Sequence, residues 1–500
     1  MRSTRFNLAV GLFVVSALLR IGAIWFWDFD GLYGQDAYAY YENAKVLYIA
    51  FPDFEQALKE YWPVGTAHPI GYSGVMAISF AFTGVTPLSG QLISLLAGSL
   101  LAPLLFLLAV KLLALEGRNE SESLKPALMA GLISSVSGVL VRSSIAVMSD
   151  ALGLSLAVLA VWLALEYGQK RRLLIIMSLA AVTSMMMMVR FVYAAVALTI
   201  LLYLYSLIRR GQKVLPLHIS LGLAFVIIIL LPQLLVNFRN LQAVIREGPI
   251  GNWSLSNLIG LHFETASGRQ SYMLPNFLFY LAPVVYPPYF SPITFPALVA
   301  GVFVNLRRGY GTTLLLLGSW FMLVYLALIG SPLQNLRHAE SYFPALAILT
   351  GIGFDSILTR WINRRTFLIS WAALGLLSMG ISGFIYLDRF LEIKRAEDQV
   401  IRWVKTNCST DTNVLAFEIT PALRHYSDFE VEELFYQDTT IVKEVLHPNK
   451  TIMVIDIKNI HTQWEGTGVF EVVRWIREHY SLTQIGVVNN YTVLRIGSPS

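Results

Sequence analysis

Long apolar segments recur along most of this chain and then stop. A membrane-spanning helix needs about 20 mostly apolar residues. On that basis the sequence predicts eleven spans, at residues 6–27, 87–113, 126–146, 150–168, 173–189, 191–208, 216–236, 276–303, 312–329, 341–358 and 366–386. The first follows Arg2 and Arg5, and no small-residue cleavage site comes after it, so we expect an uncleaved anchor.

The pattern changes after residue 386. Residues 389–408 place Leu391, Val400, Ile401 and Val404 at roughly helical spacing, which indicates an amphipathic helix. Strand-like runs follow at 413–417, 451–457, 483–488 and 491–496, with a second amphipathic helix at 468–480. The expected fold is therefore mainly α: a multi-pass membrane domain of about eleven helices over 1–386, and a small α/β domain over 387–500.

Composition supports a membrane protein. Of 500 residues, 55% are hydrophobic and only 14% are charged, whereas soluble chains carry about a quarter charged residues. The net charge of +5 is scattered among short loops, so it gives no reason to expect nucleic acid as a partner. Cys408 is the one cysteine, which rules out an intrachain disulfide.

Basic residues set the predicted orientation. A short apolar segment at 69–85 could either cross the membrane or lie at its surface, and this choice sets the side on which every later loop lies. If it does not cross, the basic clusters such as Lys170, Arg171 and Arg172 all fall on the N-terminal side. Cytoplasmic loops carry the excess of Lys and Arg. We therefore predict a plasma (inner) membrane protein with a cytoplasmic N-terminus, and with loops 28–68 and 237–275 and the 387–500 domain outside.

Asp36 and His68 are candidates in the first outer loop. Asp36 lies in "GQDAYAYYENA", where a partly buried carboxylate can act as a general base. Alternatively, it caps a helix that begins at Ala37. His68 stands before Pro69, where it could contact a ligand or serve only in packing.

Further candidates stand at later span ends on the same predicted side. Asp150 ends "RSSIAVMSD" and Arg190 lies in "MMVRFVY". Two interpretations remain for this pair: a salt bridge between Asp150 and Arg190, or binding of a phosphate by the Arg190 guanidinium. The same two alternatives apply to "NLRHAESYFPAL", which contains Arg337, His338, Glu340 and Tyr342. The remaining histidines are isolated and there is no Gly-rich nucleotide loop, so we expect no cofactor and no metal.

The order of these motifs resembles the GT-C superfamily of integral-membrane glycosyltransferases, in particular the branch of protein O-mannosyltransferases and aminoarabinose transferases. The shared features, in order, are an apolar anchor, an acidic motif in the first outer loop, His-Pro before the next apolar segment, Ser-Asp at the start of a span, a basic residue at the start of a later span, and an Arg shortly before a Pro at the start of a late span. Together they cover most of residues 1–386. In this sequence Gln35 replaces the first acid of the acidic pair. That departure leaves Asp36 as the sole base in the motif.

The resemblance implies a cell-envelope enzyme that transfers a hexose or pentose on the outer face of the membrane. Its donor would be a polyprenyl- or dolichyl-phosphate sugar, its acceptor a hydroxyl of a glycan, lipid or protein, and the stereochemistry would invert. The implied roles are catalytic for Asp36 and Asp150, phosphate-binding for Arg190 and Arg337, and substrate-binding for Tyr38, His68, His338 and Tyr342. The Trp-Trp-Asp motif of oligosaccharyltransferases is absent.

A transporter or lipid flippase with an outer sensing domain is the alternative. Transporters place ionisable residues and broken helices near mid-membrane. Here the interiors of the spans are almost free of charge apart from Arg20, and the candidate charges gather on one side. This distribution favours the enzyme.

Overall fold

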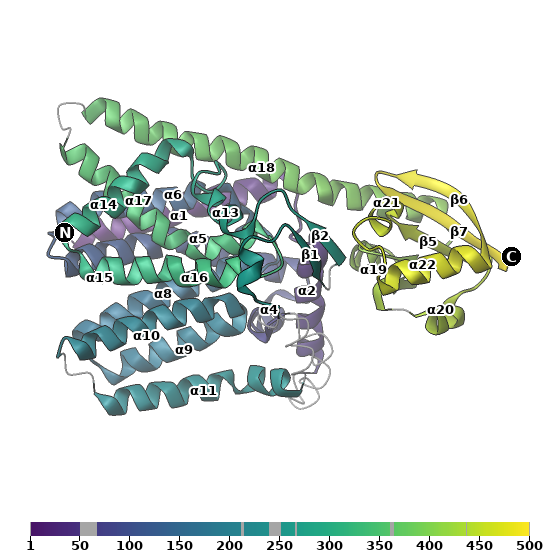
Figure 1. The fold of residues 1–500 in the computed structure, drawn as a ribbon, viewed down its shortest axis with the longest axis horizontal. Coiled ribbons are helices and arrows are strands. Elements are labelled where there is room, and N and C mark those ends of the chain that lie inside the picture. Colours follow the sequence, from purple (N-terminus) through teal and green to yellow (C-terminus); the bar gives the residue numbers. More distant parts are fainter. Residues whose placement is uncertain are drawn as a thin grey trace. The chain divides into compact units, whose positions relative to one another are not determined.

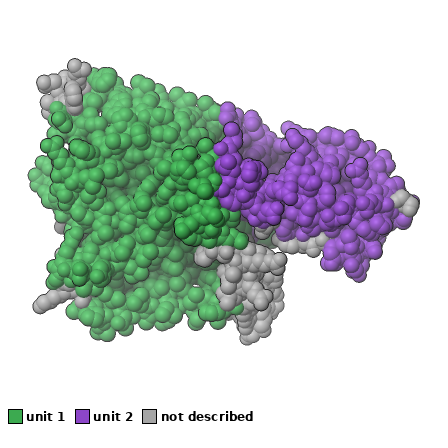
Figure 2. Space-filling view, viewed as in Figure 1, with its two compact units in different colours: residues 1–32, 40–259, 274–387 green, residues 33–39, 260–273, 388–500 purple. Residues whose placement is uncertain are grey.

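A computed structural model of the chain describes residues 2–50, 68–211, 215–239, 252–265, 268–360, 365–436 and 438–499. They form two compact units, coloured separately in Figure 2. The membrane unit comprises residues 1–32, 40–259 and 274–387. The second unit comprises residues 33–39, 260–273 and 388–500, and we call it the outer unit after the side of the membrane that the sequence predicts for it. The boundary between the units falls within helix α2 (Gly34–Ile49).

The membrane unit is a bundle of apolar helices (Figure 1). Within the described ranges, eight helices are long and apolar enough to cross a membrane. The count is nine if α6 (Glu120–Val136) and α7 (Gly138–Ile145), which meet at a bend of 59°, form one span. The spans include α1 (Arg2–Trp27), α5 (Pro87–Leu115), α8 (Asp150–Lys170), α10 (Ala194–Arg209), α11 (Pro216–Arg239) and α17 (Phe343–Arg360). A further span is the helical run Gly311–Ile329, which ends with α16 (Ser319–Ile329). This architecture confirms the predicted mainly helical membrane fold.

Two shorter helices pack in the same bundle. Helix α4 (Ile70–Thr83) has 14 residues, and α9 (Leu173–Val189) has 17. At 1.5 Å per residue α4 is about 21 Å long, whereas the hydrocarbon core is about 30 Å thick. This length agrees with the expectation that segment 69–85 does not cross by itself.

The predicted span 276–303 is not a single helix. The segment contains α13 (Asn276–Phe279), the short turns η3 (Ala282–Val284) and η4 (Pro292–Thr294), and only then α14 (Phe295–Arg308). Proline removes a backbone donor and clashes with the preceding turn. The apolar content of the segment suggested a helix, but its prolines at 283, 287, 288 and 292 interrupt it.

The outer unit is built on a five-stranded sheet with the order β4-β3-β5-β7-β6. Strands β3 (Asn413–Ala416), β4 (Val431–Glu433) and β5 (Thr451–Ile455) are parallel, and β6 (Tyr480–Val488) and β7 (Tyr491–Pro499) are antiparallel. Helices α19 (Thr420–Tyr426), α20 (Thr439–Val445), α21 (Ile457–Ile460) and α22 (Gly468–His479) complete it. All four predicted strand runs are found. The sequence did not predict β4, which is short and contains two glutamates.

The outer unit also includes pieces of both predicted outer loops. The hairpin of β1 (His262–Thr265) and β2 (Gly268–Ser271) joins the tail through the Arg269 backbone amide, which donates to the Gln463 carbonyl at 2.6 Å. Residues 33–39 come from the first loop. Because segments packed into one folded unit must lie on one side of a membrane, both loops and the tail share a side.

Helix α18 (Arg365–Asn407) extends for 43 residues and supplies residues to both units. The sequence predicted a span at 366–386 and a separate amphipathic helix at 389–408. The two are continuous because no proline or glycine follows Gly383 within the helix.

Candidate functional site

Asp150 is the meeting point of two arginines in the membrane unit. It begins α8, where the positive end of the helix dipole stabilises a carboxylate, and it is only 2% exposed. Arg190, between α9 and the turn η1 (Phe191–Tyr193), forms an ion pair with its Oδ1. Arg337 places Nε 3.4 Å from the same oxygen. The sequence suggested the Asp150–Arg190 pair, but it did not reveal that Arg337 joins it.

A second buried carboxylate lies in this cluster. Glu340 is 2% exposed, and its two oxygens accept hydrogen bonds from the Ser143 hydroxyl at 2.7 and 2.6 Å. It also interacts electrostatically with Arg142, Arg190 and Arg337. Three arginines and two carboxylates leave one net positive charge. Such a buried, net positive group is suited to an anion, because charges interact more strongly where water is scarce.

Tyr40 links the first-loop helix to this cluster, a role that the sequence analysis missed. The Tyr40 hydroxyl lies 2.8 Å from the hydroxyl of Ser149, the residue before Asp150. Its ring packs against His68 at 4.7 Å and Tyr72 at 5.1 Å between centroids. His68 therefore lies one side chain away from the start of α8.

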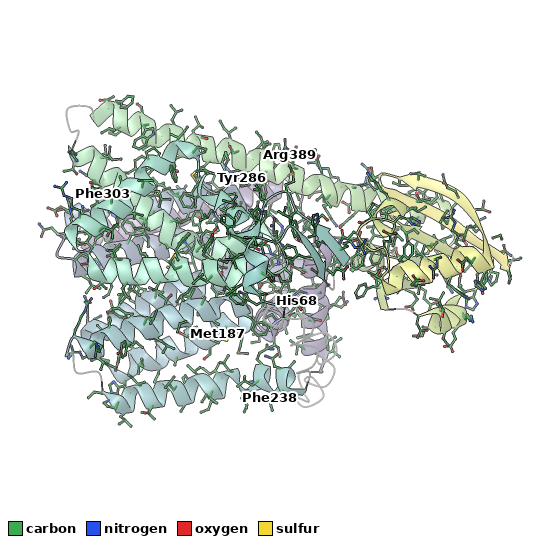
Figure 3. All side chains as sticks on the ribbon, in the orientation of Figure 1. His68, Met187, Phe238, Tyr286, Phe303 and Arg389 are labelled. Atoms are coloured by element: carbon green, nitrogen blue, oxygen red, sulfur yellow. The ribbon has the colours of Figure 1, made fainter. Side chains whose placement is uncertain are left out.

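Gly71 explains how α4 approaches the end of α9. A Cβ atom on Gly71 would lie 2.6 Å from the backbone carbon of Met188, two residues before Arg190. Only glycine allows this approach of two backbones. The "HPIGYSG" motif thereby lets the start of α4 pack against the end of α9; Figure 3 labels His68, which precedes α4, and Met187 of α9.

The other predicted residues lie in different surroundings. Tyr342 is fully buried in the membrane unit, and its hydroxyl donates to the Tyr280 carbonyl at 2.6 Å. His338 is partly buried in the turn η6 (Leu336–Tyr342), where its backbone amide donates to the Asn335 carbonyl at 3.0 Å. Their predicted part in substrate binding stays a prediction.

Asp36 and Tyr38 belong to the outer unit. The structure places Asp36 in the first turn of α2 and not at its N-cap, because the helix begins at Gly34. Its side chain is partly exposed, as a base needs. Tyr38 is 3% exposed, and its hydroxyl accepts a hydrogen bond from Lys394 at 3.3 Å.

An apolar cavity of about 340 Å³ lies in another part of the membrane unit. Its walls come from α1, α6, α7 and α18, and include Gly22, Phe26, Gly138, Gly383 and Phe384. No charged side chain lines it, so it could accept a hydrocarbon chain but not a phosphate. The charged cluster at Asp150 is the better candidate for chemistry. Among the residues that the structure describes, no group of three or more His, Cys, Asp or Glu side chains could hold a metal ion.

A family model matches part of this chain. Residues 67–235 match the family described as dolichyl-phosphate-mannose-protein mannosyltransferase. No curated protein matches the chain in sequence.

Solved structures match over nearly the whole chain. ArnT from Cupriavidus metallidurans, bound to undecaprenyl phosphate, is 12% identical with a TM-score of 0.62, over 98% of this chain and 97% of its own. The archaeal oligosaccharyltransferase AglB from Archaeoglobus fulgidus, in complex with an inhibitory peptide and a dolichol-phosphate, is 12% identical with a TM-score of 0.59, over 98% of this chain and 74% of its own. The chain therefore has the fold of the GT-C membrane glycosyltransferases, and the predicted resemblance to that superfamily is confirmed.

Proposed function

We propose that this protein transfers a sugar from a polyprenyl-phosphate or dolichyl-phosphate donor to a hydroxyl acceptor on the outer face of the membrane. The observation that carries the proposal is the convergence of Arg190 and Arg337 on the buried Asp150. These residues come from three distant parts of the chain. Together with the fold, and with the lipid phosphates bound by the similar proteins ArnT and AglB, they support a site for a lipid-linked phosphate.

The two arginines act on the leaving group. As the bond between the anomeric carbon and the phosphate oxygen breaks, the electron pair goes to that oxygen. Arg190 and Arg337 stabilise the resulting charge, an effect that is worth about 3–4 kcal/mol for one well-placed donor. Asp150 holds both guanidinium groups in place before the donor binds, so it occupies the arginines until the phosphate replaces it.

Asp36 acts on the acceptor. Its carboxylate removes the proton of the acceptor hydroxyl while that oxygen forms the new bond to the anomeric carbon. Attack from the face opposite the phosphate inverts the configuration, as in other single-displacement sugar chemistry. A general base of this kind contributes roughly 10²–10⁴-fold. No metal or other cofactor takes part in this scheme, because the phosphate is already a good leaving group.

The location on the outer face rests on charge and on packing. The basic loops favour an extracytoplasmic C-terminal domain. Residues 33–39, which contain Asp36, pack into the same unit as that domain and so share its side.

Transfer by the purified protein in proteoliposomes tests the proposal. The probes are polyprenyl phosphates that carry different single sugars, each offered with glycan, lipid and peptide acceptors. We expect one donor to yield a new glycoside and free polyprenyl phosphate without ATP. The alternative, a transporter or flippase, predicts movement of the lipid across the bilayer with the sugar–phosphate bond intact.

A further inference from the structure

A lysine is buried beside the first turn of α2. Lys394 is 7% exposed, although lysine is seldom buried without partners. Its ammonium donates to the Tyr426 hydroxyl at 2.9 Å and to the Tyr38 hydroxyl at 3.3 Å, and it lies 3.2 Å from Asp398 Oδ1. An ammonium has three donors, so these three oxygens satisfy it completely.

The partners of Lys394 come from three elements of the outer unit. Lys394 and Asp398 are one turn apart on α18, Tyr426 ends α19, and Tyr38 belongs to α2. The ammonium also lies 4.0 Å from the centre of the Tyr426 ring, a close cation–π contact. The Tyr38 and Tyr426 rings are 6.3 Å apart in an edge-on arrangement. Lys394 thus joins the C-terminal domain to the start of α2.

A second contact holds the same stretch on the other side of Asp36. Tyr33 packs against Phe390 with ring centres 4.1 Å apart. Phe390 is one helical turn before Lys394 on α18, so both contacts use one face of that helix. Asp36 therefore lies between two residues, Tyr33 and Tyr38, that α18 holds in place.

The hydrogen bond between Lys394 and Tyr38 fixes the orientation of α2 in a way that apolar packing alone would not. An apolar surface tolerates rotation and sliding of a helix, whereas a buried charge must meet its partners in one geometry. The hydrogen bond to Tyr38 fixes the rotation of the first turn of α2. That rotation sets the direction in which Asp36, two residues earlier, presents its carboxylate.

We propose that Lys394 and Tyr426 form a clamp by which the C-terminal domain positions Asp36 for catalysis. Lys394 is a positioning residue that acts through Tyr38, and it does not touch substrate. This inference rests on the proposed function, in which Asp36 is the base. It assigns the C-terminal domain a part in the reaction.

The test compares Lys394→Met with Lys450→Met, which alters an exposed lysine of the same unit, 69% exposed at its side chain. We expect Lys394→Met to lower kcat between about 10-fold and 100-fold, the scale of an error of about 1 Å in the position of a reacting group. The KM for the donor should change less than about twofold, because the arginines are untouched. Hydrogen exchange of a peptide that covers residues 33–39 should become faster. Lys450→Met should match the wild type in kcat, in KM for the donor and in hydrogen exchange at residues 33–39.

A milder variant keeps the test decisive if Lys394→Met does not fold. Tyr426→Phe removes one hydroxyl and leaves the ring. It should lower kcat in the same direction by less, and Lys394→Arg, which keeps the charge, should recover part of the Lys394→Met loss. Wild-type kcat and wild-type exchange at 33–39 in Tyr426→Phe, and in Lys394→Met if it folds, would overturn the clamp.

The outcome separates this inference from the proposed function. If Asp36→Asn transfers sugar normally, the assignment of the base is wrong, whatever Lys394 does to exchange at 33–39. If Asp36→Asn is inactive while the clamp variants keep wild-type kcat and exchange, the base assignment stands and the clamp is wrong.

Discussion

Arg337 reaches across 187 positions of sequence to place its Nε 3.4 Å from Oδ1 of Asp150, an oxygen that Arg190 already contacts. One carboxylate therefore serves two guanidinium groups inside the membrane unit. With Arg142 and Glu340 also in the cluster, three arginines face two carboxylates, so the cluster keeps the capacity to bind a further anion.

Removal of the Asp150 carboxylate should lower the free energy of unfolding. Asp150→Asn removes the carboxylate that both buried guanidinium groups contact and leaves only Glu340 to balance them, and breaking a buried pair in this way costs about 3–5 kcal/mol. The unfolding temperature in detergent measures the loss. Asp388→Asn is the control, because its partner Arg395 is 52% exposed, and an exposed pair is worth about 1 kcal/mol or less. Equal unfolding temperatures for the two variants would contradict the account of the cluster.

Removal of one arginine should weaken donor binding and leave the fold intact. Arg337→Gln keeps the Asp150–Arg190 pair, so we expect little loss of stability. The affinity for polyprenyl phosphate should fall at least about 10-fold, since a charge-assisted hydrogen bond to phosphate is worth about 1.5–3 kcal/mol. Titration calorimetry in detergent measures the affinity. The matched variant Arg269→Gln changes an exposed arginine of the outer unit and should bind like the wild type. Unchanged affinity in Arg337→Gln would remove Arg337 from the phosphate site.

A methyl group at position 71 should disturb the charged cluster at Asp150 indirectly, by displacing the end of α9 that precedes Arg190. The Cβ of Gly71→Ala would lie 2.6 Å from the Met188 backbone, so α4 or the end of α9 must move. We expect lower thermal stability and weaker binding of polyprenyl phosphate. Gly74→Ala, three residues later on α4, has no atom within 4 Å of its Cβ and should resemble the wild type. Gly71→Ala with wild-type stability and binding would show that the close approach is not needed.

The outer unit should have a pH-dependent stability of its own. Burial raises the pKa of Glu418 above its ordinary value of 4.5, although the Asn459 amide and the Trp464 indole donate to the carboxylate. The folded state then binds a proton more tightly than the unfolded state does. Stability is therefore greatest below pH 4.5 for this group, and it falls as the pH rises through the folded pKa.

Glu418→Gln should make the fall in stability with rising pH shallower, and a smaller slope should remain because burial also raises the pKa of Glu433. The free energy of opening of the outer unit, from hydrogen exchange of the β5 amides across a pH series, measures it. Glu478→Gln is the control, since that side chain is 60% exposed. A slope that persists unchanged in Glu418→Gln would assign the pH dependence to another group.

The apolar pattern predicted much of the fold, and charge placement pointed to three members of the charged cluster, whose part in a functional site stays a prediction. Spans were found because about 20 apolar residues leave a clear signal, and Asp150, Arg190 and Arg337 were found because charges at span ends are conspicuous. The contact between Tyr40 and Ser149 could not be predicted, because helix periodicity does not say which helices meet. The break in 276–303 could have been predicted from its prolines.

Lys394 shows a further limit of sequence reasoning. In "EIKRAEDQ" it stands among charged residues and has the appearance of a solvated lysine. Its burial depends on Tyr38 and Tyr426, which lie 356 and 32 positions away along the chain. Only the folded outer unit brings these residues together.

Single-turnover transfer by Asp36→Asn tests the central claim most directly. The protein is first loaded with a polyprenyl-phosphate sugar that the wild type uses, and the acceptor is then added. The account predicts donor binding within about twofold of the wild type, and a transfer rate that falls at least about 100-fold because the general base is lost. Transfer at a rate close to that of the wild type would contradict the claim that Asp36 is the base.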